Sequence, residues 1–406
     1  FKQKTAYEIM PSLVGSEMCI RDSPGAWQLV DPGRRRSLGI DAVLVGEGEE
    51  KAPELFRRIL GGRVPEVTRG STVPLERIPP IVGPTIGGIV EVARGCDRGC
   101  AFCLPNMLTK RSMPMDRILH EVRINIAAGN QPLFHAEDVL SYGARGWKVN
   151  EAAVYQLFEK TLNVPGVQRA SMSHFSISSV AQAPDLVARL SELVAHHRGE
   201  EVGEGGRFVL SGQVGVETGS PRLMKIHMLG KPKPYSPEEW PDVVVRAFEI
   251  LKENYWVPCA TLIIGLPGEE TKDVEQSTEL VERLRDFPSL IIPLFYVDLA
   301  NLAGGHSFCL DDLRPEHGEL FFKCWLNTIR WVPGLFKSQM VPALRGRLQR
   351  RAVEFLVEGG LRYGIRAAKI CEKHYGWDLR AMVLDIREGR RKVMPGAFRP
   401  LFALAR

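Results

Sequence analysis

The sequence lacks any apolar run long enough to cross a membrane. Its best candidate, residues 290–302, is short and carries Asp298, whereas a spanning helix needs about 20 apolar residues. The chain also has no internal repeat and no long low-complexity segment. With 44% hydrophobic and 25% charged residues, its 406 residues have the composition of an ordinary globular protein of two or three domains. We therefore expect a cytoplasmic protein that does not bind membranes.

Cysteine is scarce outside one short stretch. Cys96, Cys100 and Cys103 stand at C-x3-C-x2-C spacing, with Phe102 directly before the last thiol. The other cysteines form no C-x-x-C pair, which predicts small buried side chains rather than a second cluster; they include Cys259, Cys309, Cys324 and Cys371. Clustered free thiols are typical of a reducing compartment.

The three-thiol motif suits a metal cluster. Thiolates from one loop can hold three irons of a four-iron, four-sulfur (4Fe–4S) cluster and leave the fourth iron open to a substrate. Gly95 and Gly99 favour a loop wrapped round a ligand over a regular helix. Zinc is the alternative, but it needs a fourth Cys or His nearby, and His120 is too distant for that pattern. A non-catalytic iron–sulfur or zinc scaffold is the third functional hypothesis.

Positive charge gathers near the C-terminus. Residues 341–406 hold 15 Lys or Arg against 6 Asp or Glu, a net charge of +9 that leaves −4 for the rest of the chain. Such a segment can meet RNA, a phosphorylated substrate or a partner protein. The solvated faces of ordinary helices are the favoured interpretation, so nucleic acid is an open partner that we do not favour.

The first part of the chain divides into three predicted segments. Residues 1–23 resemble translated sequencing adapter and are predicted to be non-native and poorly ordered. Within residues 24–75, a strand near 40–45, a turn and a helix ending at Leu60 form a small α/β unit. Pro-rich residues 76–87 are the predicted linker.

Residues 88–305 alternate short apolar runs with longer amphipathic ones, as repeated β–α units do. The predicted strands are 88–93, 132–136, 169–175, 209–216, 258–264 and 291–297, and the predicted helices lie near 116–128, 150–162, 184–198, 236–254 and 271–286. In parallel β/α folds the chemistry gathers where strands end. Residues 306–406 are predicted to be a helical C-terminal domain, with helices at 321–332, 342–359 and 361–375.

Three segments together resemble the radical S-adenosylmethionine (SAM) superfamily. They are the cysteine motif, Gly215-Val216-Glu217-Thr218-Gly219-Ser220, and Ile263-Ile264-Gly265-Leu266-Pro267-Gly268-Glu269, and the resemblance extends over about residues 85–305. It implies an α/β fold with a partial six-stranded parallel (β/α)6 barrel. It also implies a 4Fe–4S cluster, SAM cleaved to a 5′-deoxyadenosyl radical, and a reductant such as ferredoxin or flavodoxin.

The resemblance also suggests site residues. Cys96, Cys100 and Cys103 would ligate the cluster as metal-binding and catalytic residues. The predicted cofactor-binding residues are Phe102, Glu137, Asp138, Ser173, Ser176, Glu217, Gly265 and Pro267. The family's Gly-Gly-Glu-like segment is replaced here by His135-Ala136-Glu137-Asp138, so the acid that pairs with the SAM ammonium is left open between the two carboxylates.

Residues 24–75 are similar to the end of the cobalamin-binding domain that precedes many radical SAM domains. The D-x-H-x-x-G cobalamin signature does not occur in this sequence, so cobalamin binding by a longer form of the protein is left open. The first functional hypothesis is a radical SAM enzyme of that branch, with methyl transfer or a related modification of an unknown substrate. The second is a methylthiotransferase-like enzyme acting on tRNA or protein, against which the missing second cysteine triplet counts.

Overall fold

The computed structural model describes residues 26–103, 109–203, 207–298, 306–335 and 346–390. Ten strands are assigned within these ranges: β1 (Val43–Val45), β2 (Val67–Arg69), β3 (Ile89–Glu91), β4 (Ala93–Arg94), β5 (Arg111–Ser112), β6 (Leu133–His135), β7 (Ser171–Met172), β8 (Leu210–Glu217), β9 (Trp256–Ile264) and β10 (Leu290–Phe295). The predicted adapter segment, residues 1–23, lies outside them. None of the helices in the described part of the chain is both long and apolar enough to span a membrane.

Two three-stranded parallel sheets form the centre of the molecule. One has the order β3-β6-β7 and the other the order β10-β9-β8. An isolated parallel bridge between His174 and Gln213 joins them, supported by backbone bonds of 2.8 Å from Gln213 N to Ser173 O and 3.1 Å from Phe175 N to Gln213 O. The expected α/β fold with parallel strands is confirmed. The predicted third strand, 169–175, was too long, because only Ser171 and Met172 pair in regular register.

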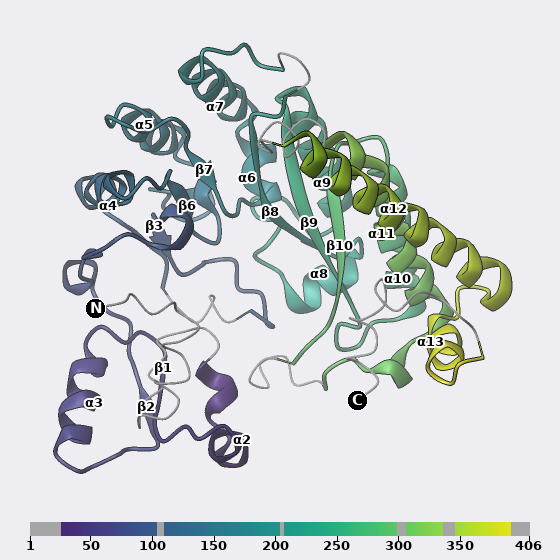
Figure 1. Ribbon diagram of the computed structural model, residues 1–406, viewed down its shortest axis with the longest axis horizontal. Helices are drawn as coiled ribbons and strands as arrows, with labels where there is room; N and C mark the ends of the chain where they lie inside the picture. The colour runs from purple at the N-terminus through teal and green to yellow at the C-terminus, as the bar shows by residue number, and fades with distance from the viewer. Residues whose placement is uncertain (1–25, 104–108, 204–206, 299–305, 336–345, 391–406) are drawn as a thin grey trace.

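Helices between successive strands cover one face of these sheets (Figure 1). They are α4 (Met115–Ala127), α5 (Glu151–Leu162), α6 (Ile177–Gln182), α7 (Pro184–His197), α8 (Pro221–His227), α9 (Trp240–Glu253) and α10 (Thr271–Arg283). The alternation along β8 shows which face they cover: Val214 and Val216 are buried, whereas Ser211 and Gln213 are exposed. Since successive side chains of a strand point to opposite faces, the face of β8 that carries Ser211 and Gln213 is the less covered one.

The N-terminal α/β unit has the strand and helix that the sequence predicts. β1 is followed by α3 (Lys51–Leu60), and β1 pairs in parallel with β2, a strand that the sequence patterns missed. A shorter helix, α2 (Pro32–Ser37), precedes them. Figure 1 shows these elements at the lower left, apart from the two larger sheets.

The C-terminal region is helical, but its predicted division was wrong. α11 (Pro315–Leu335) is followed by one continuous helix, α12 (Arg347–Tyr375), and by α13 (Leu379–Arg387). We expected a break at Gly359-Gly360, yet the helix runs through both glycines. Packing of α12 along α11 (Figure 1) outweighs the low helix propensity of the two glycines.

Candidate functional site

The cysteine motif lies in a loop whose two ends are paired. β4 and β5 form an antiparallel ladder in which Ala93 faces Ser112 and Arg94 faces Arg111. The loop between them follows the end of β3. This agrees with the rule that functional residues of parallel β/α folds lie where strands end. Gly95 and Gly99 have φ values of 80° and 68°, which a right-handed helix does not allow. The expectation of a loop rather than a helix is therefore confirmed.

The three thiols are sheltered and close enough to influence one another. Cys100 is 8% exposed, and Cys96 and Cys103 are half-buried. Burial, together with the charge of Cys100, raises the pKa of Cys96 and raises that of Cys103 to about 12. None of the three forms a disulfide bond.

The described side chains contain no group of three Cys, His, Asp or Glu arranged to hold a single metal ion. A tetrahedral zinc site needs four donors converging on one ion. A 4Fe–4S cluster instead takes each thiolate on a different iron, so its ligands stand further apart. The donor set of the loop, three thiols and no fourth protein ligand, therefore fits a four-iron cluster better than zinc.

Arg98 anchors the middle of the cysteine loop. Its guanidinium donates to the carbonyl oxygens of Lys231 (3.3 Å) and Lys233 (2.7 Å), to Asp138 Oδ2 (3.3 Å) and to Ser179 Oγ (3.2 Å). The loop backbone adds a bond of 2.7 Å from Ala101 N to the carbonyl oxygen of His227 in α8. These contacts tie the loop to elements that follow β6, β7 and β8.

The two candidate carboxylates after β6 have different environments. Asp138 is 6% exposed and accepts bonds from Ser176 N (3.1 Å), Ser179 Oγ (2.6 Å) and Arg98. Its side chain makes no capping bond to the short helical turn that it precedes. Glu137 is exposed and makes no hydrogen bond or ion pair among the described residues.

A polar cleft opens beside the loop. Its lining includes Cys96, Arg98, Lys110, Glu137, Asp138 and Trp147. Burial lowers the pKa of Lys110, partly offset by the charges of Asp138 and Asp97, and its ammonium donates to Ser141 O at 3.0 Å. The cleft thus brings both candidate carboxylates next to the first cysteine.

Glu217 ends β8 in a buried ion pair. Its Oε1 accepts from Lys231 Nζ at 2.9 Å, and its Oε2 accepts from Thr261 Oγ1 at 3.2 Å. Burial alone would lower the pKa of Lys231, but the charges of Glu217, Cys100 and Cys103 outweigh burial and raise it. The side chain of Glu217 is only 11% exposed, so the pair is not a surface salt bridge.

Backbone geometry makes room for this pair. Glu217 itself has φ 65°, an uncommon value for a residue with a side chain. A Cβ atom on Gly215 would lie 2.0 Å from Glu217 Oε1 and 2.6 Å from Lys231 Nζ. A side chain at position 215 would therefore displace the ends of the Glu217–Lys231 pair.

The predicted serines lie where β7 ends. Ser173 Oγ sits between two imidazoles, 3.1 Å from His135 Nδ1 and 2.9 Å from His174 Nδ1. Burial lowers the pKa of His174, so its ring is neutral at pH 7. Ser176 lies directly before α6 and shares a 2.8 Å bond with the Ser178 hydroxyl, which in turn donates to Lys231 O at 3.1 Å.

The turn after β9 has the shape expected of a backbone surface. Gly265 has φ 85°, and a Cβ there would lie 1.9 Å from the Phe308 ring. Its N–H donates to Glu269 Oε1 at 3.0 Å, and the same carboxylate bonds His317 of α11 at 3.0 Å. Pro267 O is 2.8 Å from His227 Nε2. Phe102 is half-buried and packs on the core.

Sequence reasoning missed Arg98, Lys231 and His317. Arg98 lies inside the cysteine motif, where the sequence pattern predicts that a charged side chain is exposed to solvent. Lys231 lies 14 residues beyond its partner Glu217, without a motif to connect them. His317 was hidden in the predicted C-terminal domain. Only Arg98 had a detectable signal, its position between two ligand candidates.

Comparison with known families matches residues 90–281 to the Radical SAM superfamily. The matched segment contains the cysteine loop, both candidate carboxylates and the Glu217–Lys231 pair. This chain contains a radical SAM domain. The superfamily uses a 4Fe–4S cluster and SAM, and the three thiols of this radical SAM domain fit that cluster.

Several relatives match parts of the radical SAM chain. An uncharacterised protein of Methanopyrus kandleri is 26% identical over 64% of this chain and 56% of its own length. A tRNA-2-methylthio-N(6)-dimethylallyladenosine synthase of Opitutus terrae is 27% identical over 49% of this chain and 38% of its own length. A ribosomal protein uS12 methylthiotransferase of Phocaeicola vulgatus is 25% identical over 48% and 41%. The chain thus spans about half the length of these relatives.

Solved structures also share features with the chain. The radical SAM methyltransferase TsrM of Kitasatospora setae, described with cobalamin and a [4Fe-4S] cluster bound, aligns with a TM-score of 0.45 and 13% identity over 67% of this chain and 55% of TsrM.

Proposed function

We propose that this protein is a radical SAM enzyme in which Cys96, Cys100 and Cys103 ligate a 4Fe–4S cluster and SAM binds at the open iron. The observation that carries the proposal is the sheltered three-thiol loop, without a fourth ligand among the described residues, inside a domain that matches the superfamily. When bound and reduced by an electron donor, the cluster would supply the one electron that cleavage of SAM to methionine and a 5′-deoxyadenosyl radical requires. The protein would bind and orient SAM and the substrate, and it would exclude water from the site.

We assign the SAM ammonium to Glu137 rather than Asp138. Asp138 is occupied by three donors from within the protein, whereas Glu137 is exposed beside Cys96 and has no partner among the described residues. An unpaired carboxylate forms a charge-assisted bond to an ammonium at no internal cost. Asp138 then serves to hold Arg98 and the loop.

The remaining contacts follow from position and charge. Lys231, held by Glu217, offsets the negative charge of thiolates at Cys100 and Cys103. Ser173 and Ser176 offer hydroxyls to the ribose or carboxylate of SAM. Phe102, Gly265 and Pro267 form an edge for the adenine.

We also propose that the six strands β3, β6, β7, β8, β9 and β10 act as one partial (β/α)6 barrel, joined at the His174–Gln213 bridge. In this organisation residues 88–305 are the radical SAM barrel, 76–87 the linker and 306–406 the helical C-terminal domain. Residues 24–75 are the end of a cobalamin-binding-like domain, and cobalamin is a candidate cofactor only for a form of the protein that contains the whole domain.

For the net reaction we place methyl transfer or a related modification first. The second candidate, methylthio transfer to tRNA or protein, is favoured by the names of two relatives. The 406 residues of this chain hold one cysteine triplet, Cys96, Cys100 and Cys103. In both cases a small electron donor such as ferredoxin or flavodoxin supplies the electron.

Anaerobic reconstitution tests the proposal. We expect about four irons per chain and, on reduction with dithionite, conversion of SAM to 5′-deoxyadenosine. Cys100→Ala should abolish both the cluster and SAM cleavage. Cys371→Ala, which removes a fully buried thiol of α12 far from the loop, is the matched control and should keep both. A fully loaded wild-type protein that leaves SAM intact would refute the radical mechanism.

A further inference from the structure

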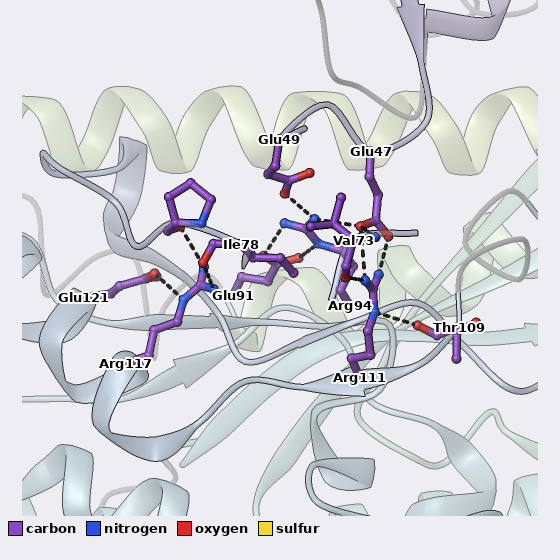
Figure 2. A network of polar contacts seen from close by, with 11 residues as sticks. Glu47, Glu49, Val73, Ile78, Glu91, Arg94, Thr109, Arg111, Arg117 and Glu121 are labelled. Atoms are coloured by element: carbon purple, nitrogen blue, oxygen red, sulfur yellow. Dashed lines mark hydrogen bonds and ion pairs between the residues drawn. The ribbon is translucent and has the colours of Figure 1, made fainter. Parts of the chain in front are cut away.

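One buried carboxylate joins the N-terminal unit to both ends of the cysteine loop. Glu47 follows β1 and is 4% exposed. It bonds Arg94 and Arg111, which lie opposite each other on β4 and β5 (Figure 2). Arg94 stands two residues before Cys96, and Arg111 stands eight residues after Cys103.

The contacts of Glu47 are dense and directed. Its Oε2 accepts from Val73 N at 2.8 Å, from Arg111 Nη1 at 3.1 Å and from Arg94 Nη1 at 3.4 Å. Its Oε1 accepts a further bond from Arg111 Nη2. A Cβ on Gly70 would lie 1.8 Å from Glu47 O, so the backbone of Glu47 packs directly against the residue that follows β2.

We call the paired strands β4 and β5 the neck of the cysteine loop. This pairing needs a carboxylate close to Arg94 and Arg111. Two cations directly opposite each other on paired strands repel, and the repulsion grows when they are shielded from water. The side chains of Arg94 and Arg111 are only 18% and 11% exposed. Opposite them, the N-terminal unit places a carboxylate that reaches both guanidinium groups.

Other acids at the neck do not replace Glu47. Glu91 (2.7 Å) and Glu49 pair with Arg94 alone. Among the described residues, Glu47 is the one carboxylate that bonds Arg111 and the one that bonds both cations. Its removal leaves Arg111 without a counter-charge in a sheltered position.

We propose that Glu47 is a positioning residue for the cluster loop: by neutralising Arg94 and Arg111 together, the N-terminal unit holds the neck of the loop closed and fixes the spacing of the thiols. The proposal rests on the proposed function only in calling the thiols cluster ligands. The pairing of β4 and β5 itself does not depend on a bound cluster.

The first test therefore uses the cluster-free protein. Hydrogen–deuterium exchange is compared for peptides covering β4 and β5 in wild type and in Glu47→Gln. We expect exchange at both strands to rise about tenfold or more, because a buried cation loses its partner. Glu54→Gln is the control: Glu54 lies in the same unit and pairs with Lys51 and Arg58 on the surface of α3. It should leave β4 and β5 unchanged.

The second test uses the reconstituted protein. We expect iron release from Glu47→Gln to a chelator to be about tenfold faster than from wild type, with a changed electron paramagnetic resonance spectrum of the reduced cluster. Glu47→Asp keeps the charge but is one methylene shorter, so it should fall between the two. If Glu47→Gln does not fold, Glu47→Asp decides by the same two measurements.

The outcomes separate this inference from the proposed function. Wild-type exchange at β4 and β5 in a folded Glu47 variant, or an increase confined to residues 42–73, overturns the positioning role. Iron retention and a resonance spectrum equal to wild type overturn it as well. A wild-type protein that assembles no cluster refutes the proposed function, while the exchange experiment still decides whether Glu47 closes the neck.

Discussion

The two three-stranded sheets are built differently. β3, β6 and β7 have 3, 3 and 2 residues, whereas β8, β9 and β10 have 8, 9 and 6. The short-stranded sheet carries the cysteine loop, Glu137, Asp138 and Ser173. The long-stranded sheet carries Glu217 and the Gly265 turn.

The difference indicates how each sheet keeps its shape. Few backbone bonds hold the short strands, and buried side chains do more of the work: Asp138 links three donors, and Ser173 links two imidazoles. The long strands are held by continuous parallel ladders with their buried face on α9. Polar substitutions should therefore be more damaging in the short-stranded sheet.

The largest effect is expected from Asp138→Ala. It removes the acceptor of Ser176 N and Ser179 Oγ and leaves Arg98 without its acid, which should lower the free energy of unfolding by about 3 kcal/mol. Urea unfolding and iron content after reconstitution measure the two consequences. A loss below about 1 kcal/mol would show that the short strands do not depend on this carboxylate.

A smaller effect is expected from Gly215→Ala in the long-stranded sheet. The added Cβ meets Glu217 and Lys231 inside van der Waals distance, so the pair must shift, at a cost of about 2 kcal/mol. Gly83→Ala, where a Cβ meets nothing within 4 Å, is the control. Equal thermal unfolding midpoints for the two variants would contradict the need for glycine at position 215.

The smallest effect is expected at the seam between the sheets. Burial lowers the pKa of His174, so the unfolded chain takes up a proton at a higher pH than the folded one. The free energy of unfolding should therefore be level above pH 6.5 and decrease below it, by less than about 1 kcal/mol at pH 5 because the ring is only half-buried. His174→Gln should remove this part of the pH dependence in urea titrations at pH 5 and pH 8. Unchanged dependence would assign it to other groups.

Much of the radical SAM domain could be predicted from periodicity and motifs. Alternating apolar runs located the six strands of the two larger sheets and five of the helices between them to within a few residues, but missed the short helices α6 and α8. The thiol spacing located the loop. The division at Gly359-Gly360 failed because helix packing overrides local propensity. β2 was missed because a strand of three residues has too short a pattern to detect.

Side-chain partners were beyond the sequence. Asp138 and Glu137 are adjacent and chemically alike, and only their surroundings show that one is engaged and the other exposed. Glu47 and Arg111 are 64 residues apart, and no local pattern connects them. Long-range pairs of this kind depend on how the units pack, which composition and spacing do not encode.

The glycine at position 215 also has an evolutionary consequence. The side chains of Glu217 and Lys231 occupy the space next to Gly215, so a substitution at one of the three positions affects which residues the other two can be. Homologues that lack the lysine or the glutamate can carry another residue in place of the glycine, whereas homologues that have both should keep the glycine. An aligned set of descendants should therefore show these three letters changing together, and the triplet is a more selective search pattern than the cysteine spacing alone.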